Sequence, residues 1–504
     1  MGSSYSLKFN YFGKDITPSF LARAQTIWGE VASLKFNYFG KDITPSFLAR
    51  AQTIWGKVEL VAIFAGFWWS FDASSTYLPV ILAITLCAFI PRYRWHIVAA
   101  ATLIVFALNP FWFNPTLPDF VAAQEGVTNQ INFNFLHYGI ALFFFCFALA
   151  VIVCKQRFGH LAVLRRPIMA LLFLYFTLVL VASQHVCHGL AQVLLWSFIT
   201  MFGGYFWFLG YALLDGSAAT TPLLLRLGTF HPFWGSSTTP IGKGVSNLHN
   251  VEAKDAIELA VIQIKGMRLI IVCSILHLVL TWFVLATHTY LGLPSLNEAI
   301  EHQAMGVPLS LASCWATLLA SFVETVMRIA VWGNSIVACA RMAGFNLLRN
   351  TYKPLQSRTL AEFWNRFYFY FKELLVDFFF FPTFLRYFKK HKRLRIIFAT
   401  FMAAFVGNII FHFMRDIDLV LRVGLVPAIA KFQTYAFYCF LLATGIAVSQ
   451  LRPRASVQGS LLHSVQFSSC CVIVFFCLIS VFDDGGEYRV PLATALSFLR
   501  RLFW

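Results

Sequence analysis

Charged side chains are scarce in this chain: Asp, Glu, Lys and Arg make up only 12% of its 504 residues, whereas hydrophobic residues make up 59%. Soluble domains carry about 25% charged residues, so this scarcity argues against a water-soluble fold. The mean hydropathy is +0.70, and apolar runs of membrane-spanning length recur from about Lys57 onwards. These runs are continuous, which argues against the short alternating strands of a transmembrane barrel.

Motifs for metal, disulfide and nucleotide chemistry are also missing. The 11 cysteines include no CxxC pair, and most of them stand inside apolar runs, which is typical of small buried side chains. His185 and His188 are three residues apart but lack a second pair of ligands, so we predict no metal site. The sequence HPFWGSSTTPIGKG (231–244) lacks the GxxxxGK[ST] spacing of a P-loop, which argues against nucleotide binding.

Acidic residues are few, and the net charge is +17. In a soluble protein this excess would suggest nucleic acid. Here the basic residues stand in short loops between apolar runs, so we expect no nucleic-acid partner and contacts with the head groups of membrane lipids instead. Lys243 is one such residue: it could contact lipid head groups or phosphates, or it could belong to an ordered loop rich in turns.

Eleven apolar runs predict an all-α, polytopic, integral membrane protein with about 11 transmembrane helices. Basic loops alternate with acidic ones along the chain, and the positive-inside rule places the basic loops and the N-terminus on the cytoplasmic side. The runs are 58–71, 77–91, 95–113, 134–154, 167–185, 190–213, 267–290, 307–340, 395–413, 419–449 and 464–482.

The N-terminal segment contains a perfect repeat. Residues 6–29 recur without a change as residues 33–56. We interpret residues 1–56 as a tandem-duplicated amphipathic segment that lies at the membrane interface; a poorly ordered arm is the alternative. Residues 57–504 then form the membrane domain.

The segment 363–385 is apolar but basic at both ends, near Arg358 and Arg386. A simple span would place one of these ends outside, so we predict a re-entrant or interfacial segment. Such backbone is tolerated at membrane depth only against protein or a water-filled cavity. We therefore expect this segment to line a cavity.

Polar residues inside apolar segments are the candidate functional residues. His412 could act as a general base, because a neutral imidazole suits a dry cavity; alternatively it only bonds a neighbouring helix. Asn365 could orient that imidazole or polarise an acyl carbonyl. Arg366 could pair with a phosphate or carboxylate of a ligand, or with Glu362 or Glu373.

The residues Phe363 to Tyr368, FWNRFY, together with His412, which lies 47 positions after Asn365, resemble a family pattern. They are similar to the membrane-bound O-acyltransferase (MBOAT) superfamily, whose bacterial members carry FWRRWH and a membrane histidine some 45–50 residues later. Tyr368 stands where that motif has its own histidine, and the context IIFHFMRD differs from that of the relatives. The chain thus resembles a divergent bacterial-type member with an MBOAT-like membrane domain at 57–504.

The resemblance implies an acyltransferase of the bacterial inner (cytoplasmic) membrane. An acyl group would pass from a cytoplasmic thioester donor, acyl-CoA or an acyl-carrier thioester, to a hydroxyl acceptor on a polysaccharide, lipid or other small molecule. No bound cofactor and no metal are expected, and an accessory protein or a homo-oligomer is a possible partner. His412 and Asn365 would be catalytic. The expected substrate-binding residues are Trp364, Arg366, Tyr368 and Glu362.

Two other functions stay open. Tyr368 in place of the motif histidine is compatible with a non-catalytic MBOAT-like scaffold. A transporter or flippase is the other possibility, and it would show inverted hydropathy repeats. The only repeat that we find is the N-terminal one.

Overall fold

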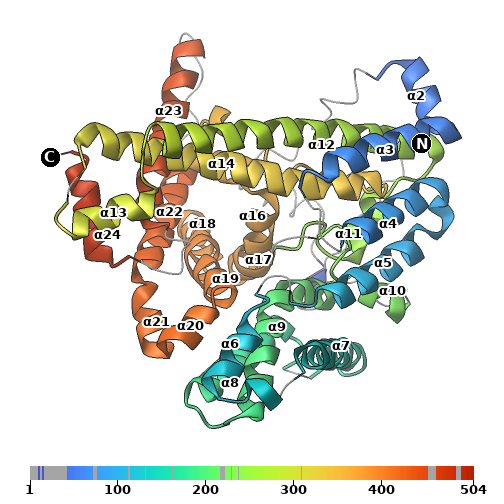
Figure 1. Cartoon of the computed structure of the whole chain (residues 1–504), viewed down its shortest axis with the longest axis horizontal. Helices are drawn as coiled ribbons and strands as arrows, with labels where there is room; N and C mark the ends of the chain where they lie inside the picture. Colours follow the sequence, from blue (N-terminus) through green and yellow to red (C-terminus); the bar gives the residue numbers. More distant parts are fainter. Residues whose placement is uncertain are drawn as a thin grey trace.

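The computed structural model describes residues 10–11, 14–15, 43–71, 76–111, 114–130, 132–161, 163–215, 222–228, 230–235, 238–307, 309–451, 461–483 and 490–503. This part of the chain is overwhelmingly helical (Figure 1). Two very short strands, β1 (Asn10–Tyr11) and β2 (Lys14–Asp15), pair antiparallel near the N-terminus. The prediction of an all-α protein is confirmed at this level.

Six helices in the described residues are long and apolar enough to cross a membrane. Several long helices begin at a side-chain cap that their sequence supplies: Asp255 caps α12 and Ser310 caps α14. The six spans are α7 (Phe133–Arg157), α9 (Leu190–Leu214), α12 (Ala256–Val284) with η5 (Leu285–Tyr290), α14 (Leu311–Met342), α18 (Lys392–Phe401) with η8 (Met402–Gly407) and α19 (Asn408–Arg415), and α22 (Gln433–Leu451).

The other apolar runs are helical but short or broken. The helices α4 (Tyr77–Phe89) and α5 (Arg94–Leu108) meet at 117° across the turn η2 (Pro91–Tyr93), as one broken span or a re-entrant loop. The run 419–449 is interrupted at Gly424, whose φ of 85° ends a helix. The described residues therefore contain six or seven candidate spans, and the expected count of about 11 is not confirmed.

The shorter elements connect these spans. They are α2 (Pro45–Gln52), α3 (Ile54–Trp68), α6 (Leu117–Gln124), η3 (Thr128–Gln130), α8 (Pro167–Ser183), α10 (Leu223–Gly228), α11 (Val245–Val251), α13 (Leu296–Ala304), η6 (Pro354–Gln356), α15 (Leu360–Phe367), α16 (Phe369–Leu375), η7 (Val376–Phe380), α17 (Phe381–Arg386), α20 (Asp418–Val423), α21 (Leu425–Lys431), α23 (Leu461–Ile479), η9 (Ser480–Phe482) and α24 (Leu492–Arg501).

The N-terminal repeat is described mainly in its second copy, which forms α2 and the start of α3. The exposed Ile54 and Trp55 lie at this junction, as an interfacial segment requires. The predicted boundary between residues 56 and 57 falls within α3. Most of the first copy lies outside the described residues, so its amphipathic character stays a prediction.

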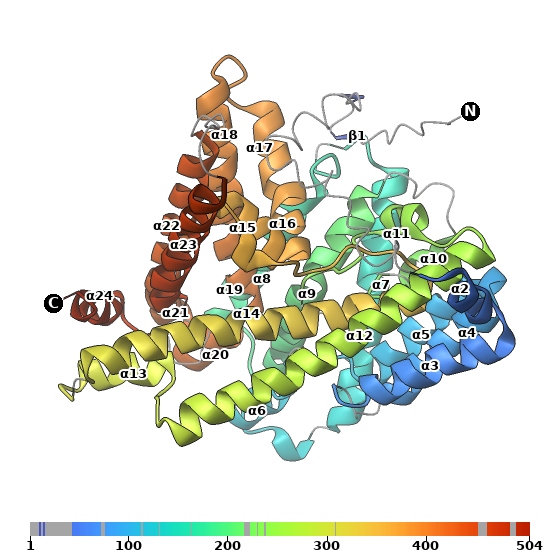
Figure 2. The same cartoon turned by 90° about the horizontal axis from the view of Figure 1, so that it is seen from above.

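The two longest helices, α12 and α14, lie side by side along the long axis of the molecule (Figures 1 and 2). Gly266 of α12 permits this approach, since an added Cβ would lie 3.0 Å from the Ala338 carbonyl oxygen. One buried apolar cluster joins α12 and α14 to α3 and α4. A larger cluster contains residues of α9, α16, α19 and α22, and it includes the rings that lie around His412.

Candidate functional site

The FWNRF sequence lies on α15, a two-turn helix closed by its own side chains. The Thr359 hydroxyl accepts a hydrogen bond from the Glu362 amide (3.1 Å), and the Glu362 carboxylate accepts one from the Arg358 amide (2.8 Å). Arg366 pairs with Glu362 at 2.6 Å, four residues apart. The predicted pairing of Arg366 with Glu362 is confirmed; a role of either residue in substrate binding stays a prediction.

The helix breaks at Tyr368, where the backbone leaves the helical region (φ −140°, ψ 75°). A neighbouring loop takes up the freed backbone groups. The Phe369 amide donates to the Asn350 carbonyl oxygen (2.9 Å), the Tyr370 amide donates to Asn350 Oδ1 (3.3 Å), and the Tyr352 amide donates to the Arg366 carbonyl oxygen (2.8 Å). The segment 363–385, predicted to be re-entrant or interfacial, is therefore a series of short helices. The break at Tyr368 lets α16 leave in a new direction from α15.

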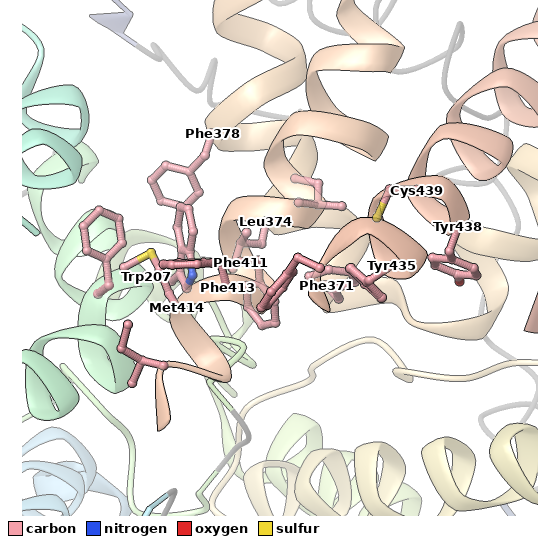
Figure 3. Packing of buried hydrophobic residues seen from close by; sticks show 14 of the residues in the cluster. Trp207, Phe371, Leu374, Phe378, Phe411, Phe413, Met414, Tyr435, Tyr438 and Cys439 are labelled. Atoms are coloured by element: carbon pink, nitrogen blue, oxygen red, sulfur yellow. The ribbon is translucent and has the colours of Figure 1, made fainter. Parts of the chain in front are cut away.

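His412 lies on α19 and is half-buried among aromatic rings. Ring centroids of Tyr435 and Phe371 lie 4.5 and 5.8 Å from its imidazole. Figure 3 shows Phe371, Phe411 and Tyr435 gathered in one part of the core, each from a different helix. The π-helical turn η8 ends five residues before His412 and widens the helix that carries it.

One ring, that of Phe371 on α16, lies between the FWNRF segment and His412. The ring of Trp364 lies 6.1 Å from that of Phe371, which in turn lies 5.8 Å from His412. Trp364 is buried and is parallel to Phe476 of α23. Asn365 is buried on the same helix as Trp364. Two sequence elements that are 47 residues apart thus share one aromatic wall.

Asn408 and Tyr435 belong to this site but were not singled out from the sequence. The Tyr435 hydroxyl donates to Asn408 Oδ1 at 2.9 Å, and Asn408 stands four residues before His412, on the same face of α19. The spacing of Asn408 and His412 could have revealed the first residue. Tyr435 comes from α22 and has no local signal.

A second polar cluster lies on another side of α16. Lys243 Nζ is 2.6 Å from the Glu373 carboxylate and 2.9 Å from that of Asp377, and Lys372 also pairs with Glu373. The Tyr211 hydroxyl donates to Asp377 at 2.9 Å. The side chains of Lys243, Glu373 and Asp377 are 21%, 22% and 19% exposed, so this ion cluster is largely withdrawn from solvent.

The charges of the ion cluster shift each other's pKa. Burial alone would raise the pKa of Glu373, but the ammonium groups of Lys243 and Lys372 outweigh it and hold that pKa below its usual range. Burial raises the pKa of Asp377, and the neighbouring Glu373 carboxylate adds to the rise. The two carboxylates raise the pKa of Lys243 against the effect of its burial.

Lys243 is thus paired with carboxylates. Of the two alternatives predicted for it, a contact with head groups or phosphates and a place in an ordered loop, the structure agrees with the loop. Its φ of 58° is left-handed, a strained conformation for a residue with a Cβ. The loop that carries Lys243 also contacts the start of α16, through a hydrogen bond of 3.3 Å between the hydroxyls of Thr239 and Tyr368. Glu373, which the sequence offered as a partner for Arg366, pairs with lysines instead.

The site therefore combines the imidazole of His412, the buried amide of Asn408 and a set of aromatic rings. Such a site can take up a proton beside the apolar chain of a ligand. The described residues contain no group of three or more His, Cys, Asp or Glu side chains that could hold a metal ion. No family model matches the chain, and no curated protein matches it in sequence.

Proposed function

We propose that this chain is a membrane-embedded O-acyltransferase, a divergent bacterial-type relative of the MBOAT superfamily. The observation that carries this proposal is the position of the Phe371 ring, whose centroid lies 5.8 Å from that of His412 and 6.1 Å from that of Trp364. The resemblance requires the FWNRF segment and the distant histidine to act at one place, and their shared neighbour Phe371 supports that requirement.

In the proposed reaction His412 is the general base. Its imidazole accepts the proton of the acceptor hydroxyl as the oxygen attacks the carbonyl carbon of the thioester. The tetrahedral intermediate collapses, the carbon–sulfur bond breaks, and the leaving thiolate takes the proton from the imidazolium. The products are the acyl ester and the free thiol. The chemistry needs no oxidant, reductant or metal.

The surroundings of His412 suit this role. Rings of Phe371, Phe411 and Tyr435 lie around the imidazole, and an imidazole is the side chain that can accept a proton near neutral pH. Tyr435 is tied to Asn408 on the same helix, so the ring against His412 is fixed in place.

The other residues of the segment take supporting roles in this proposal. Asn365 would stabilise the oxyanion or orient the acceptor, and Trp364 would line the acyl site. Arg366 is already neutralised by Glu362, so this pair would shape the site more than it would bind a free phosphate. Tyr368 replaces the motif histidine and would present its hydroxyl, which is within 3.3 Å of Thr239, to the substrate.

The finer topology is part of the same proposal. About 11 membrane passages, some of them bent or broken, place the N-terminus and the basic loops in the cytoplasm of a bacterium, on the side of the thioester donor. Single-cysteine variants in a cysteine-free background test this. Cysteine at the exposed Lys390 should react with an impermeant maleimide only after the inner membrane is opened, whereas cysteine at the exposed Glu301 should react in intact spheroplasts.

The decisive experiment measures acyl transfer from acyl-CoA, and separately from an acyl-carrier thioester, by the purified full-length protein. His412→Ala should lower the turnover by at least about 10²-fold, the usual contribution of general base catalysis, without loss of folded protein. His277→Ala is a matched control, because His277 is also half-buried on a membrane helix against an aromatic ring, that of Phe71. Turnover of His412→Ala equal to that of the control would refute the assignment.

Transport is the second candidate, and the ion cluster around Lys243, which is largely withdrawn from solvent, favours it, since paired ionisable groups inside a membrane protein often mark ion or proton pathways. Proteoliposomes that carry an internal pH dye distinguish the two functions. Proton or solute flux that depends on Lys243, together with no acyl transfer from either donor, would favour the transporter. If neither acyl transfer nor flux is measured, the non-catalytic scaffold is the better description.

A further inference from the structure

A strongly basic turn, residues 386–395, joins α17 to α18, the first helix of a candidate membrane span. Six of the ten residues in this basic turn are lysine or arginine. The chain has no Asp or Glu between Asp377 and Asp416, so no acidic residue interrupts the charge. Figure 2 shows the basic turn at the top of the view, where it projects beyond the neighbouring helices. Positive charge is therefore concentrated at one end of a span.

Four of these basic side chains are exposed and have no carboxylate partner in the part of the chain that the structure describes: Lys389, Lys390, Lys392 and Arg393. Lys392 and Arg393 are also the first two residues of α18, whose first turn has no acidic residue. Cations at a helix N-terminus meet the positive end of the helix dipole, which is unfavourable. The stability of α18 thus does not explain the cluster, whereas an anion against it would relieve the repulsion among its charges.

Aromatic residues hold the basic turn in one shape. The ring centroids of Tyr387 and Phe388 lie 5.7 and 5.1 Å from that of Phe398 on α18. Phe388 has a left-handed backbone (φ 48°), which a residue with a Cβ keeps only where its surroundings impose it. At the base of the turn, the Arg395 guanidinium donates to the Phe384 carbonyl oxygen and lies 3.9 Å from the centroid of the Phe384 ring. An ordered turn therefore presents the exposed cations.

Apolar surface accompanies this charge. Tyr387 and Phe388 are 48% and 41% exposed although they contact Phe398, and Leu394 is exposed beside them. Aromatic rings at the end of a membrane helix are typical of the bilayer interface. Clusters of four to eight basic residues next to such a helix attract anionic lipid head groups. A soluble anion would use the charges alone, whereas a lipid would also use the exposed rings.

We propose that the basic turn is a docking site for anionic phospholipid, with the lipid phosphates against its four exposed cations and the rings of Tyr387 and Phe388 at the interface beside them. The turn links α17, which follows the FWNRF segment, to the span that carries His412. Bound lipid would therefore hold α17 against α18 and stabilise the protein. Lipid binding of this kind does not depend on acyl transfer.

The test compares the melting temperature of the full-length protein in nanodiscs of phosphatidylcholine alone and of phosphatidylcholine mixed with phosphatidylglycerol. Both faces of a nanodisc are open to solvent, so the influence of loop charge on orientation in the cell does not enter. We expect a higher melting temperature with phosphatidylglycerol, and a smaller difference at high salt, because salt screens exposed charges. Equal melting temperatures in both kinds of disc would overturn the proposal. So would an equal rise from soluble glycerol phosphate added to phosphatidylcholine discs.

A charge-removing variant locates the lipid. Lys389→Gln, Lys390→Gln and Arg393→Gln together remove three exposed charges and leave the rings in place. A basic side chain near a membrane surface contributes about fivefold to the affinity for anionic lipid, so the triple variant should bind phosphatidylglycerol about 10²-fold more weakly. Lipid titration followed by native mass spectrometry measures this. If the triple variant does not fold, Lys389→Gln alone decides: a loss of about fivefold is expected, and unchanged binding overturns the proposal.

The matched control removes the same number of exposed charges from the loop between α7 and α8. Arg157→Gln, Arg165→Gln and Arg166→Gln together should leave the tightest binding of phosphatidylglycerol unchanged. A loss as large as that of the triple variant in the basic turn would show that total charge attracts the lipid, and no particular docking site would remain.

Discussion

Two sides of the short helix α16 carry opposite kinds of polar chemistry. Phe371 lies against the imidazole of His412, whereas Glu373, two residues later and so about 200° around the helix, belongs to the ion cluster with Lys243 and Asp377. On the first side the polar group is the imidazole of His412, which lies among aromatic rings. On the second side the polar groups are the paired charges around Lys243.

The comparison shows two ways to keep polar groups inside an apolar protein. An imidazole enters an apolar wall cheaply because it can stay neutral. Carboxylates and ammonium groups enter only with partners, and removal of one partner leaves an uncompensated buried charge. In the proposed function the His412 side would change its protonation during the reaction, whereas the paired charges of the Lys243 side hold α16 in place. Substitutions on the two sides should accordingly change the free energy of unfolding by different amounts.

The largest effect is expected on the charged side. Lys243→Met should lower the free energy of unfolding by about 3 kcal/mol, the lower end of the range for broken buried pairs, because the partners keep about a fifth of their surface exposed. Thermal unfolding of the purified protein measures it. Arg50→Met is the control, because the Arg50–Glu59 pair is exposed and should hardly matter. Equal effects of both substitutions would mean that the ion cluster does not hold α16.

A packing change on the neutral side should be smaller. Gly407 ends η8, and an added Cβ would lie 2.5 Å from the ring of Phe379 in η7. Gly407→Ala should therefore cost about 1–3 kcal/mol by overpacking and lower acyl transfer, because η8 leads into the helix of His412. Gly139→Ala serves as the control, since its Cβ would meet open space. Stability and transfer as good in Gly407→Ala as in Gly139→Ala would contradict this account of the close approach.

The smallest effect comes from the same substitution on both sides. Tyr211→Phe removes a hydrogen bond to the Asp377 carboxylate, and Tyr435→Phe removes one to the amide oxygen of Asn408. Bonds to charged groups contribute about 1.5–3 kcal/mol and neutral ones about 0.5–1.5. Tyr211→Phe should thus lower the free energy of unfolding by about 1 kcal/mol more than Tyr435→Phe does, and thermal unfolding measures the difference. The reverse order would remove the distinction between a charged and a neutral side of α16.

Much of the local structure could be predicted from the sequence. The pairing of Glu362 with Arg366 follows from their spacing of four, and the helical class follows from the continuous apolar runs. The number of spans could not be predicted in the same way. Hydropathy reports how apolar a run is, but it does not report the bend of 117° between α4 and α5 or the break at Gly424.

The sequence by itself determined an all-helical, membrane-type protein and the short-range contacts of α15, because these depend on composition and on neighbours within one or two turns. Only the tertiary structure decided that Phe371 lies against His412 and that Lys243 is held by Glu373 and Asp377. The physical reason is distance along the chain. Lys243 and Glu373 are 130 residues apart, and no periodicity or spacing encodes which distant helices pack together.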